Sequence, residues 1–109
     1  MRPTHLAAML DLAGRDVLIV GGGAVAARRA ATLLEAAAAV RVVSPTLTAA
    51  LRTRHRAGEI SWEARGWRPG DCRGAFLVVV ASADPAVNAQ AAAEARGAGA
   101  LVNDAQTPG

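Results

Sequence analysis

A short apolar run that ends in three glycines is the feature that most constrains the fold of this chain. Val17–Val20 is continuous and rich in β-branched residues, which is typical of a strand covered on both faces of a parallel sheet. Residues 21–26 then read Gly-Gly-Gly-Ala-Val-Ala and match the spacing G-x-G-x-x-A. Residues 24–36 follow with the apolar periodicity of a helix. A strand, a glycine turn and a helix in this order predict the start of a β-α-β unit.

The same alternation continues to the end of the chain. Further strands are predicted at residues 40–43, 60–64, 76–81 and 100–102. The strand at 60–64 alternates between apolar and polar side chains, which indicates an edge strand with one wet face. Strands that alternate with helices predict a parallel sheet with helices on both faces. We therefore expect a doubly wound, Rossmann-like α/β fold of about five strands in the order 3-2-1-4-5.

Two more helices complete this pattern. One is predicted at residues 46–57, because Pro45 ends the preceding strand and can open a helix. The other is predicted at 85–96, with Asp84 as its N-cap and Pro85 in its first turn. The glycine- and proline-rich residues 65–74 are predicted to form a loop.

Length and composition limit the class of protein. A chain of 109 residues with 52% hydrophobic residues fits one folded domain, spanning residues 1–109, and excludes intrinsic disorder. Its longest charge-free apolar run, Val17–Ala27, falls short of the about 20 residues that cross a membrane. We expect no signal peptide after Met1 and no internal disulfide from the single Cys72, which together favour a cytoplasmic protein.

The charge of the chain and its potential metal ligands indicate neither a nucleic-acid partner nor a structural metal. The net charge is +3, and all 12 basic residues are arginine, without the basic and aromatic clusters that nucleic-acid binding requires. His5, His55 and Cys72 lack the spacing of metal ligands, so no structural metal is expected. Trp62 and Trp67 are expected to pack in the core, with a stacking role as the open alternative.

Each small residue in the glycine turn has a distinct physical role. Gly21 permits a tight turn, Gly23 lets a pyrophosphate approach the backbone, and Ala26 lets the helix pack closely on the strand. The N–H groups of Gly23, Ala24 and Val25 then point at the ligand from the positive end of the helix dipole. We therefore predict a dinucleotide site, with a purely structural turn as the alternative.

The expected ribose-binding carboxylate is missing. An acidic residue about 20 positions after the glycine turn usually binds the adenosine ribose. Here the second strand ends in Ser44-Pro45-Thr46, so Ser44 or Thr46 is the candidate ribose partner. Because no carboxylate repels a 2′-phosphate, the residues alone leave NAD and NADP both open.

Several separated segments resemble the N-terminal domain of siroheme synthase, the precorrin-2 dehydrogenase family. The similarity runs from about residue 10 to residue 108 and is carried by residues 12–29, 33–36, 42–45, 67–71, 74–88 and 101–103. It implies an NAD-dependent enzyme of siroheme biosynthesis that oxidises precorrin-2, a tetrapyrrole, to sirohydrochlorin. Some members also insert ferrous iron.

The resemblance also implies roles for individual residues. Ala24 and Val25 would contact NAD through their backbone, and Pro45 and Thr46 would lie beside the adenosine. Ala81 and Ser82 would lie near the nicotinamide half, at the end of the fourth strand.

The chain departs from the family pattern in three places. The position of the family's acid/base aspartate holds Gln106, whose amide cannot exchange a proton near neutral pH. Asp104 is the nearest carboxylate and becomes the candidate catalytic residue, with a solvated or turn-forming aspartate after the strand as the alternative. A non-catalytic NAD(P)-binding regulatory or sensor module is therefore the alternative function.

The other two departures concern chain length and a helix end. The family's dimerisation region has no counterpart here, so a homodimer would form through a region absent from this sequence. Ala37 also replaces the glycine that usually ends the first helix of the family.

Overall fold

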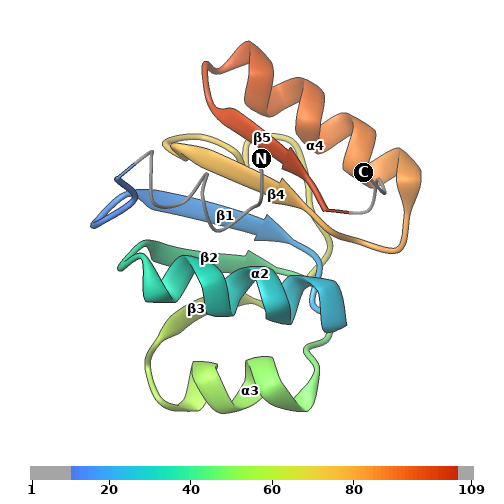
Figure 1. Cartoon of the computed structure of the whole chain (residues 1–109). Helices are drawn as coiled ribbons and strands as arrows, with labels where there is room; N and C mark the ends of the chain where they lie inside the picture. Colours follow the sequence, from blue (N-terminus) through green and yellow to red (C-terminus); the bar gives the residue numbers. More distant parts are fainter. Residues whose placement is uncertain (1–10, 106–109) are drawn as a thin grey trace.

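A computed structural model describes residues 11–105 of the chain. Five parallel strands form one sheet in the order β3-β2-β1-β4-β5, and their arrows point the same way in Figure 1. The strands are β1 (Asp16–Val20), β2 (Ala39–Val43), β3 (Ile60–Glu63), β4 (Leu77–Val80) and β5 (Leu101–Asp104). The predicted fold class and strand order are confirmed.

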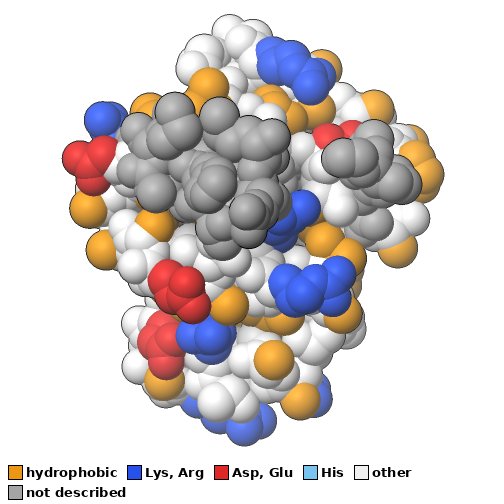
Figure 2. Space-filling view, in the orientation of Figure 1, with side chains coloured by type: hydrophobic (Ala, Val, Ile, Leu, Met, Phe, Trp, Pro, Cys, Tyr) orange, Lys and Arg blue, Asp and Glu red, His pale blue; other side chains and the backbone are white. Residues whose placement is uncertain are grey.

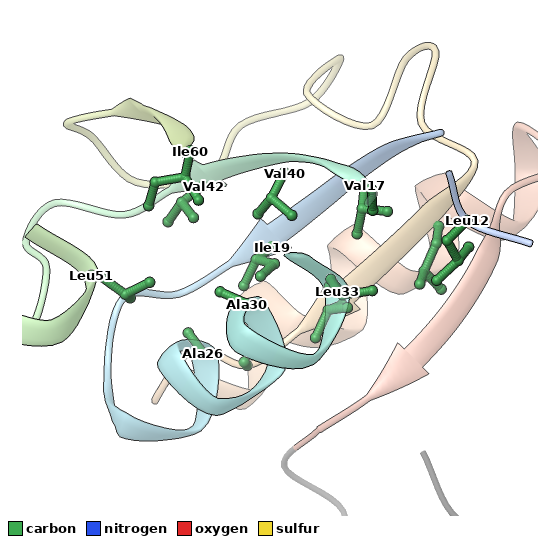
Figure 3. Close-up of a cluster of buried hydrophobic side chains, with 14 of the residues drawn as sticks. Leu12, Val17, Ile19, Ala26, Ala30, Leu33, Val40, Val42, Leu51 and Ile60 are labelled. Carbon is green, nitrogen blue, oxygen red and sulfur yellow. The ribbon is translucent and has the colours of Figure 1, made fainter. Parts of the chain in front are cut away.

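The central strands are buried because both faces of the sheet are covered. The helices are α2 (Ala24–Glu35), α3 (Ala49–Arg56) and α4 (Pro85–Gly97). Helices α2 and α3 cover one face, where a cluster of buried apolar side chains includes Ile19, Ala30 and Val42 (Figure 3). Helix α4 and the loop before β4 cover the other face, whose cluster includes Leu18 and Cys72. This two-layer covering explains why β1 and β4 lack apolar–polar alternation.

The edge strand β3 and the last helix α4 agree with the predictions made from the sequence. β3 buries Ile60 and half-buries Trp62, while Ser61 and Glu63 between and after them are exposed. Asp84 caps α4, since its side chain accepts a hydrogen bond from the Ala86 N–H at 2.9 Å. Both features follow from local sequence rules alone.

Helix α3 begins later than the predicted residue 46. Its N-cap is Thr48, whose side chain accepts a hydrogen bond from the Leu51 N–H at 3.4 Å. Residues 44–48 instead fold against the glycine turn, where the Thr48 N–H donates to the Gly22 carbonyl oxygen at 2.9 Å. The prediction that Pro45 opens the helix was wrong because a tertiary hydrogen bond holds the residues before Thr48 away from helical geometry.

The last strand is longer than predicted. β5 extends to Asp104, which pairs with Val80 of β4, and the Ala105 N–H also donates to the Val80 carbonyl oxygen at 3.0 Å. The expectation that Asp104 follows the strand in a turn was therefore wrong. Gln106 lies outside the described residues.

Candidate functional site

A cleft of about 710 Å³ opens at the carboxyl ends of β1, β2 and β4. This is where doubly wound sheets bind ligands, at the point where the strand order reverses, and the volume suits a cofactor. The nine residues predicted to bind the cofactor all line this one cleft: Gly21, Gly23, Ala24, Val25, Ser44, Pro45, Thr46, Ala81 and Ser82. Three segments that lie far apart in the sequence thus meet at one place.

The first two glycines of the turn are required by packing against the protein itself. Gly21 has a φ of +123°, and a Cβ there would lie 2.6 Å from the Ala81 carbonyl oxygen. A Cβ on Gly22 would overlap the Thr46 carbonyl oxygen and lie 2.8 Å from Ser44 Oγ. These two positions therefore let the turn approach the ends of β4 and β2.

Gly23 is the residue whose missing side chain leaves room for a ligand. A Cβ at Gly23 would meet no protein atom within 4 Å among the described residues, although the residue lines the cleft. It is also the N-cap of α2, and no described side chain caps that helix end. The N–H groups at the start of α2 therefore face the cleft, which suits the pyrophosphate of a dinucleotide.

In the loop after β2, Ser44 makes structural contacts, whereas Pro45 and Thr46 are exposed at the cleft. Ser44 is buried, and its hydroxyl donates to the Thr46 carbonyl oxygen at 2.7 Å, while its own carbonyl oxygen accepts from Trp62 Nε1 at 2.8 Å. Pro45 and Thr46 are exposed at the cleft. Of the two candidate ribose partners, Thr46 thus has the more accessible side chain.

The turn after β4 is held by a buried asparagine. Asn88 Oδ1 accepts hydrogen bonds from the Ser82 N–H at 3.1 Å and from Ser82 Oγ at 2.9 Å. Asn88 Nδ2 donates to the Ser82 carbonyl oxygen at 2.9 Å. Because one side chain binds both backbone groups of Ser82, the turn at this end of the cleft has a fixed shape.

Asp104 lies at the rim of a neighbouring hollow. This hollow of about 500 Å³ is lined by Asp104 with residues of the β4–α4 turn and of α4, and it shares Ser82 and Ala83 with the main cleft. Asp104 itself is not among the residues that line the main cleft. The carboxylate is therefore adjacent to the Ser82 end of the site.

Some cleft residues were not predicted from the sequence. Gly66, Trp67 and Val87 also line the cleft, although Trp67 was expected to pack in the core, with a stacking role as the alternative. The loop that carries Trp67 has no periodicity, and only its tertiary hydrogen bonds bring it to the carboxyl edge of the sheet. No sequence signal could have placed it there.

The arginines form no single basic surface on the face shown in Figure 2, where they lie in separate patches and some of them adjoin acidic side chains. Arg54 on α3 pairs with Glu59 at 2.8 Å, and Arg41 on β2 donates to the Asp71 carbonyl oxygen at 3.3 Å, away from the cleft. Within residues 11–105, no group of three potential metal ligands occurs. No helix in that part of the chain is long and apolar enough to span a membrane.

Known proteins are similar to this chain in sequence and fold. The family model described as "Putative NAD(P)-binding" matches residues 8–109. Siroheme synthase from Photorhabdus laumondii subsp. laumondii is 43% identical over 99 residues, which are 91% of this chain and 21% of that protein. Siroheme synthase from Azotobacter vinelandii is 39% identical over 104 residues, or 95% of this chain and 22% of that protein.

A solved structure shows the same fold. SirC, precorrin-2 dehydrogenase, superposes with a TM-score of 0.78 at 35% sequence identity, covering 93% of this chain and 49% of that one. The chain thus spans about a fifth of the two siroheme synthases and about half of SirC. The chain belongs to this NAD(P)-binding family and is related in sequence to siroheme synthases and in sequence and fold to precorrin-2 dehydrogenase.

Proposed function

We propose that this chain is the NAD-binding part of a dehydrogenase that oxidises precorrin-2 to sirohydrochlorin in siroheme biosynthesis. The observation that carries the proposal is the single cleft that gathers all nine predicted cofactor residues around the uncapped start of α2. The names of its relatives, siroheme synthase and precorrin-2 dehydrogenase, support the reaction and the tetrapyrrole substrate.

The residues of the chain would bind and orient the two reactants. Bound NAD would supply the hydride acceptor. The N–H groups of Gly23, Ala24 and Val25 would hold the pyrophosphate, and Thr46 and Pro45 would lie beside the adenosine. The Ser82 turn, fixed by Asn88, would define the other end of the cleft, and the apolar Val20 and Val43 also line it.

Asp104 would be the residue that accepts a proton from the substrate. The hollow that Asp104 lines together with Ser82 supports this role, because a general base must lie within reach of the proton that it accepts. Asp104→Asn is then expected to lower the turnover rate by a factor on the order of 100 or more, with an unchanged Kd for NAD.

We also propose a cytoplasmic homodimer. The family resemblance supports dimerisation through a region outside this sequence.

The enzyme proposal is tested under anaerobic conditions with precorrin-2 and NAD. The appearance of NADH absorbance, with sirohydrochlorin as product, is the expected result. NAD is expected to raise the melting temperature of the protein, and a parallel titration with NADP measures the preference between the two cofactors. Binding of NAD without any NADH formation would exclude the dehydrogenase.

A non-catalytic NAD(P)-binding module is the second candidate. It is favoured by the position of Asp104, which lines the neighbouring hollow and not the cleft itself. Calorimetry separates the two functions, because both bind NAD but only the enzyme also binds the tetrapyrrole.

A further inference from the structure

The two tryptophans of the chain have different surroundings. Trp62 lies on β3, where its indole N–H donates to the Ser44 carbonyl oxygen at 2.8 Å and its ring meets the ring of His55 edge to face. Trp67 instead lines the cleft and packs against the apolar cluster that includes Val43, the last residue of β2. The same cluster holds the ends of β1 and β4, Val20 and Val80, but the loop of Trp67 leaves β3 at Glu63, which pairs with Val43 of β2. Trp67 thus forms a wall of the cleft on the β2 side.

The loop that carries Trp67 is fixed on both sides of the residue. Arg65 donates two hydrogen bonds to the carboxylate of Asp71, at 2.9 and 2.8 Å, and Asp71 Oδ2 also accepts from the Arg68 N–H at 2.8 Å. The Arg65 guanidinium holds the pKa of Asp71 below its ordinary value, so this pair stays charged at neutral pH. The chain just before and just after Trp67 is therefore tied to one carboxylate.

A second carboxylate anchors the same loop to the core. Glu94 of α4 accepts hydrogen bonds from the Gly70 N–H at 2.7 Å and from the Cys72 N–H at 2.9 Å, and these bonds lower the pKa of Glu94. The loop that carries Trp67 is thus held by Asp71 from within and by Glu94 of α4 from outside. Such anchoring limits the entropy that an aromatic wall would lose when a ligand binds.

The polar atom of the Trp67 indole is buried. Trp67 Nε1 is buried beside the Cys72 thiol and has no nitrogen or oxygen partner in the described part of the chain. Burial raises the pKa of that thiol to about 11, so it remains a neutral packing group. Because Trp67 is only partly buried, the surface that its ring exposes is carbon, which suits contact with a planar heterocycle.

We propose that Trp67 is a specificity-determining residue of the cofactor site, where its indole packs against the adenine ring of the dinucleotide. This inference rests on the proposed function, because it requires a dinucleotide in the cleft. The start of α2 takes the pyrophosphate at the centre, and Trp67 lies with Val43 and the Ser44–Thr46 loop near the end of β2. Ser82 and Asp104 mark the opposite end. The adenine half therefore meets the aromatic wall.

Single-tryptophan proteins can test this contact directly, since the sequence holds only these two tryptophans. Trp62→Phe leaves Trp67 as the fluorophore, and Trp67→Phe leaves Trp62 as the matched control. Titration with ADP-ribose or AMP is expected to quench the fluorescence of the Trp62→Phe protein and to leave that of the Trp67→Phe protein unchanged. Nicotinamide mononucleotide is expected to quench neither.

Affinity gives a second measurement. Trp67→Leu is expected to weaken the binding of ADP-ribose about tenfold, as measured by calorimetry, because base stacking on an aromatic ring is lost. Trp67→Phe is expected to recover most of the affinity, because it restores an aromatic face. Melting temperatures show whether each variant is folded.

The outcomes separate this inference from the proposed function. If ADP-ribose binds the unaltered protein but neither quenches Trp67 nor binds Trp67→Leu more weakly, the role of Trp67 is wrong and the proposed function stands. Quenching by nicotinamide mononucleotide and not by AMP also overturns the inference. If the unaltered protein binds neither NAD nor ADP-ribose, the proposed function itself fails.

Discussion

Three consecutive glycines meet two different constraints in this protein. Gly21 and Gly22 lack side chains because the carbonyl oxygens of Ala81 and Thr46 occupy the space that a Cβ would need. Gly23 has no such neighbour, so its missing side chain serves the cleft. The motif G-x-G-x-x-A predicts a ligand-binding role for Gly23, but the packing role of Gly22 depends on the loop after β2 and could not be read from the motif.

The different environments of Gly22 and Gly23 lead to a prediction for Gly23→Ser. Gly23 has the backbone geometry of an N-cap, with φ −92° and ψ −162°, and serine caps helices better than glycine by a few tenths of a kcal/mol. The free energy of unfolding is therefore expected to stay unchanged or to rise slightly. The Kd for NAD is expected to rise by a factor on the order of ten or more, since the new side chain occupies the pyrophosphate position.

Calorimetry and denaturant unfolding check these two expectations together. Gly22→Ala is the matched control: its Cβ would overlap the Thr46 carbonyl oxygen, and such overpacking lowers stability by about 1–3 kcal/mol. A Gly23→Ser protein that binds NAD as tightly as the unaltered chain would rule out a pyrophosphate at the start of α2.

Among the secondary-structure elements, helix ends differ in how well the sequence predicts them. Asp84 and Pro85 mark the start of α4 by local chemistry, and the structure agrees. The start of α3 depends on the Thr48–Gly22 hydrogen bond between segments distant in sequence, so local rules placed it too early. Helix α2 ends near Ala36, as the sequence predicted. The next residue, Ala37, holds a position that favours glycine.

The end of α2 leads to a stability prediction. Ala38 N–H donates to the Leu33 carbonyl oxygen at 3.1 Å and Ala37 N–H to that of Leu34 at 3.0 Å, which is the Schellman pattern. Ala37 has a φ of +63°, a left-handed conformation that strains a residue with a Cβ. Ala37→Gly is therefore expected to raise the free energy of unfolding by about 1 kcal/mol, even after the greater flexibility of glycine in the unfolded chain.

Urea unfolding followed by circular dichroism measures this difference. The neighbouring Ala36→Gly is the control, because Ala36 has a φ of −85° and glycine there gains nothing in the folded state. The free energy of unfolding of the Ala36→Gly protein is expected to fall by about 0.5–1 kcal/mol. Equal effects of the two substitutions would show that the backbone strain at Ala37 is absent in solution.

At the scale of the whole molecule, the parallel sheet separates a binding edge from a structural edge. Strands β1, β2 and β4 end in register at Val20, Val43 and Val80, and the three loops that follow them form the cleft. The loops at the amino ends of the strands lie at the opposite edge. A ligand in the cleft is therefore expected to slow amide exchange in all three of these loops, although they are distant in sequence. The effect is expected only at the carboxyl edge of the sheet.

Hydrogen exchange with and without NAD tests this arrangement. Slower exchange is expected for the amides of residues 22–25, 46–48 and 81–83, which border the cleft. The amides of residues 14–16, 58–60 and 99–101, before or at the amino ends of β1, β3 and β5, serve as the internal control and are expected to be unchanged. Uniform protection at both edges would indicate global stabilisation and not binding in this cleft.

The sequence by itself determined the strand and helix order, the sheet topology and the glycine turn, because these depend on apolar periodicity and on which residues tolerate a tight turn. It also predicted nine candidate cofactor residues, which line one cleft in the structure, since the carboxyl ends of neighbouring parallel strands must meet. Only the tertiary structure decided the start of α3, the inclusion of Asp104 in β5 and the position of Trp67 in the cleft. Each depends on hydrogen bonds or packing between segments distant in sequence, such as Glu94 with Gly70, and no local pattern encodes these contacts.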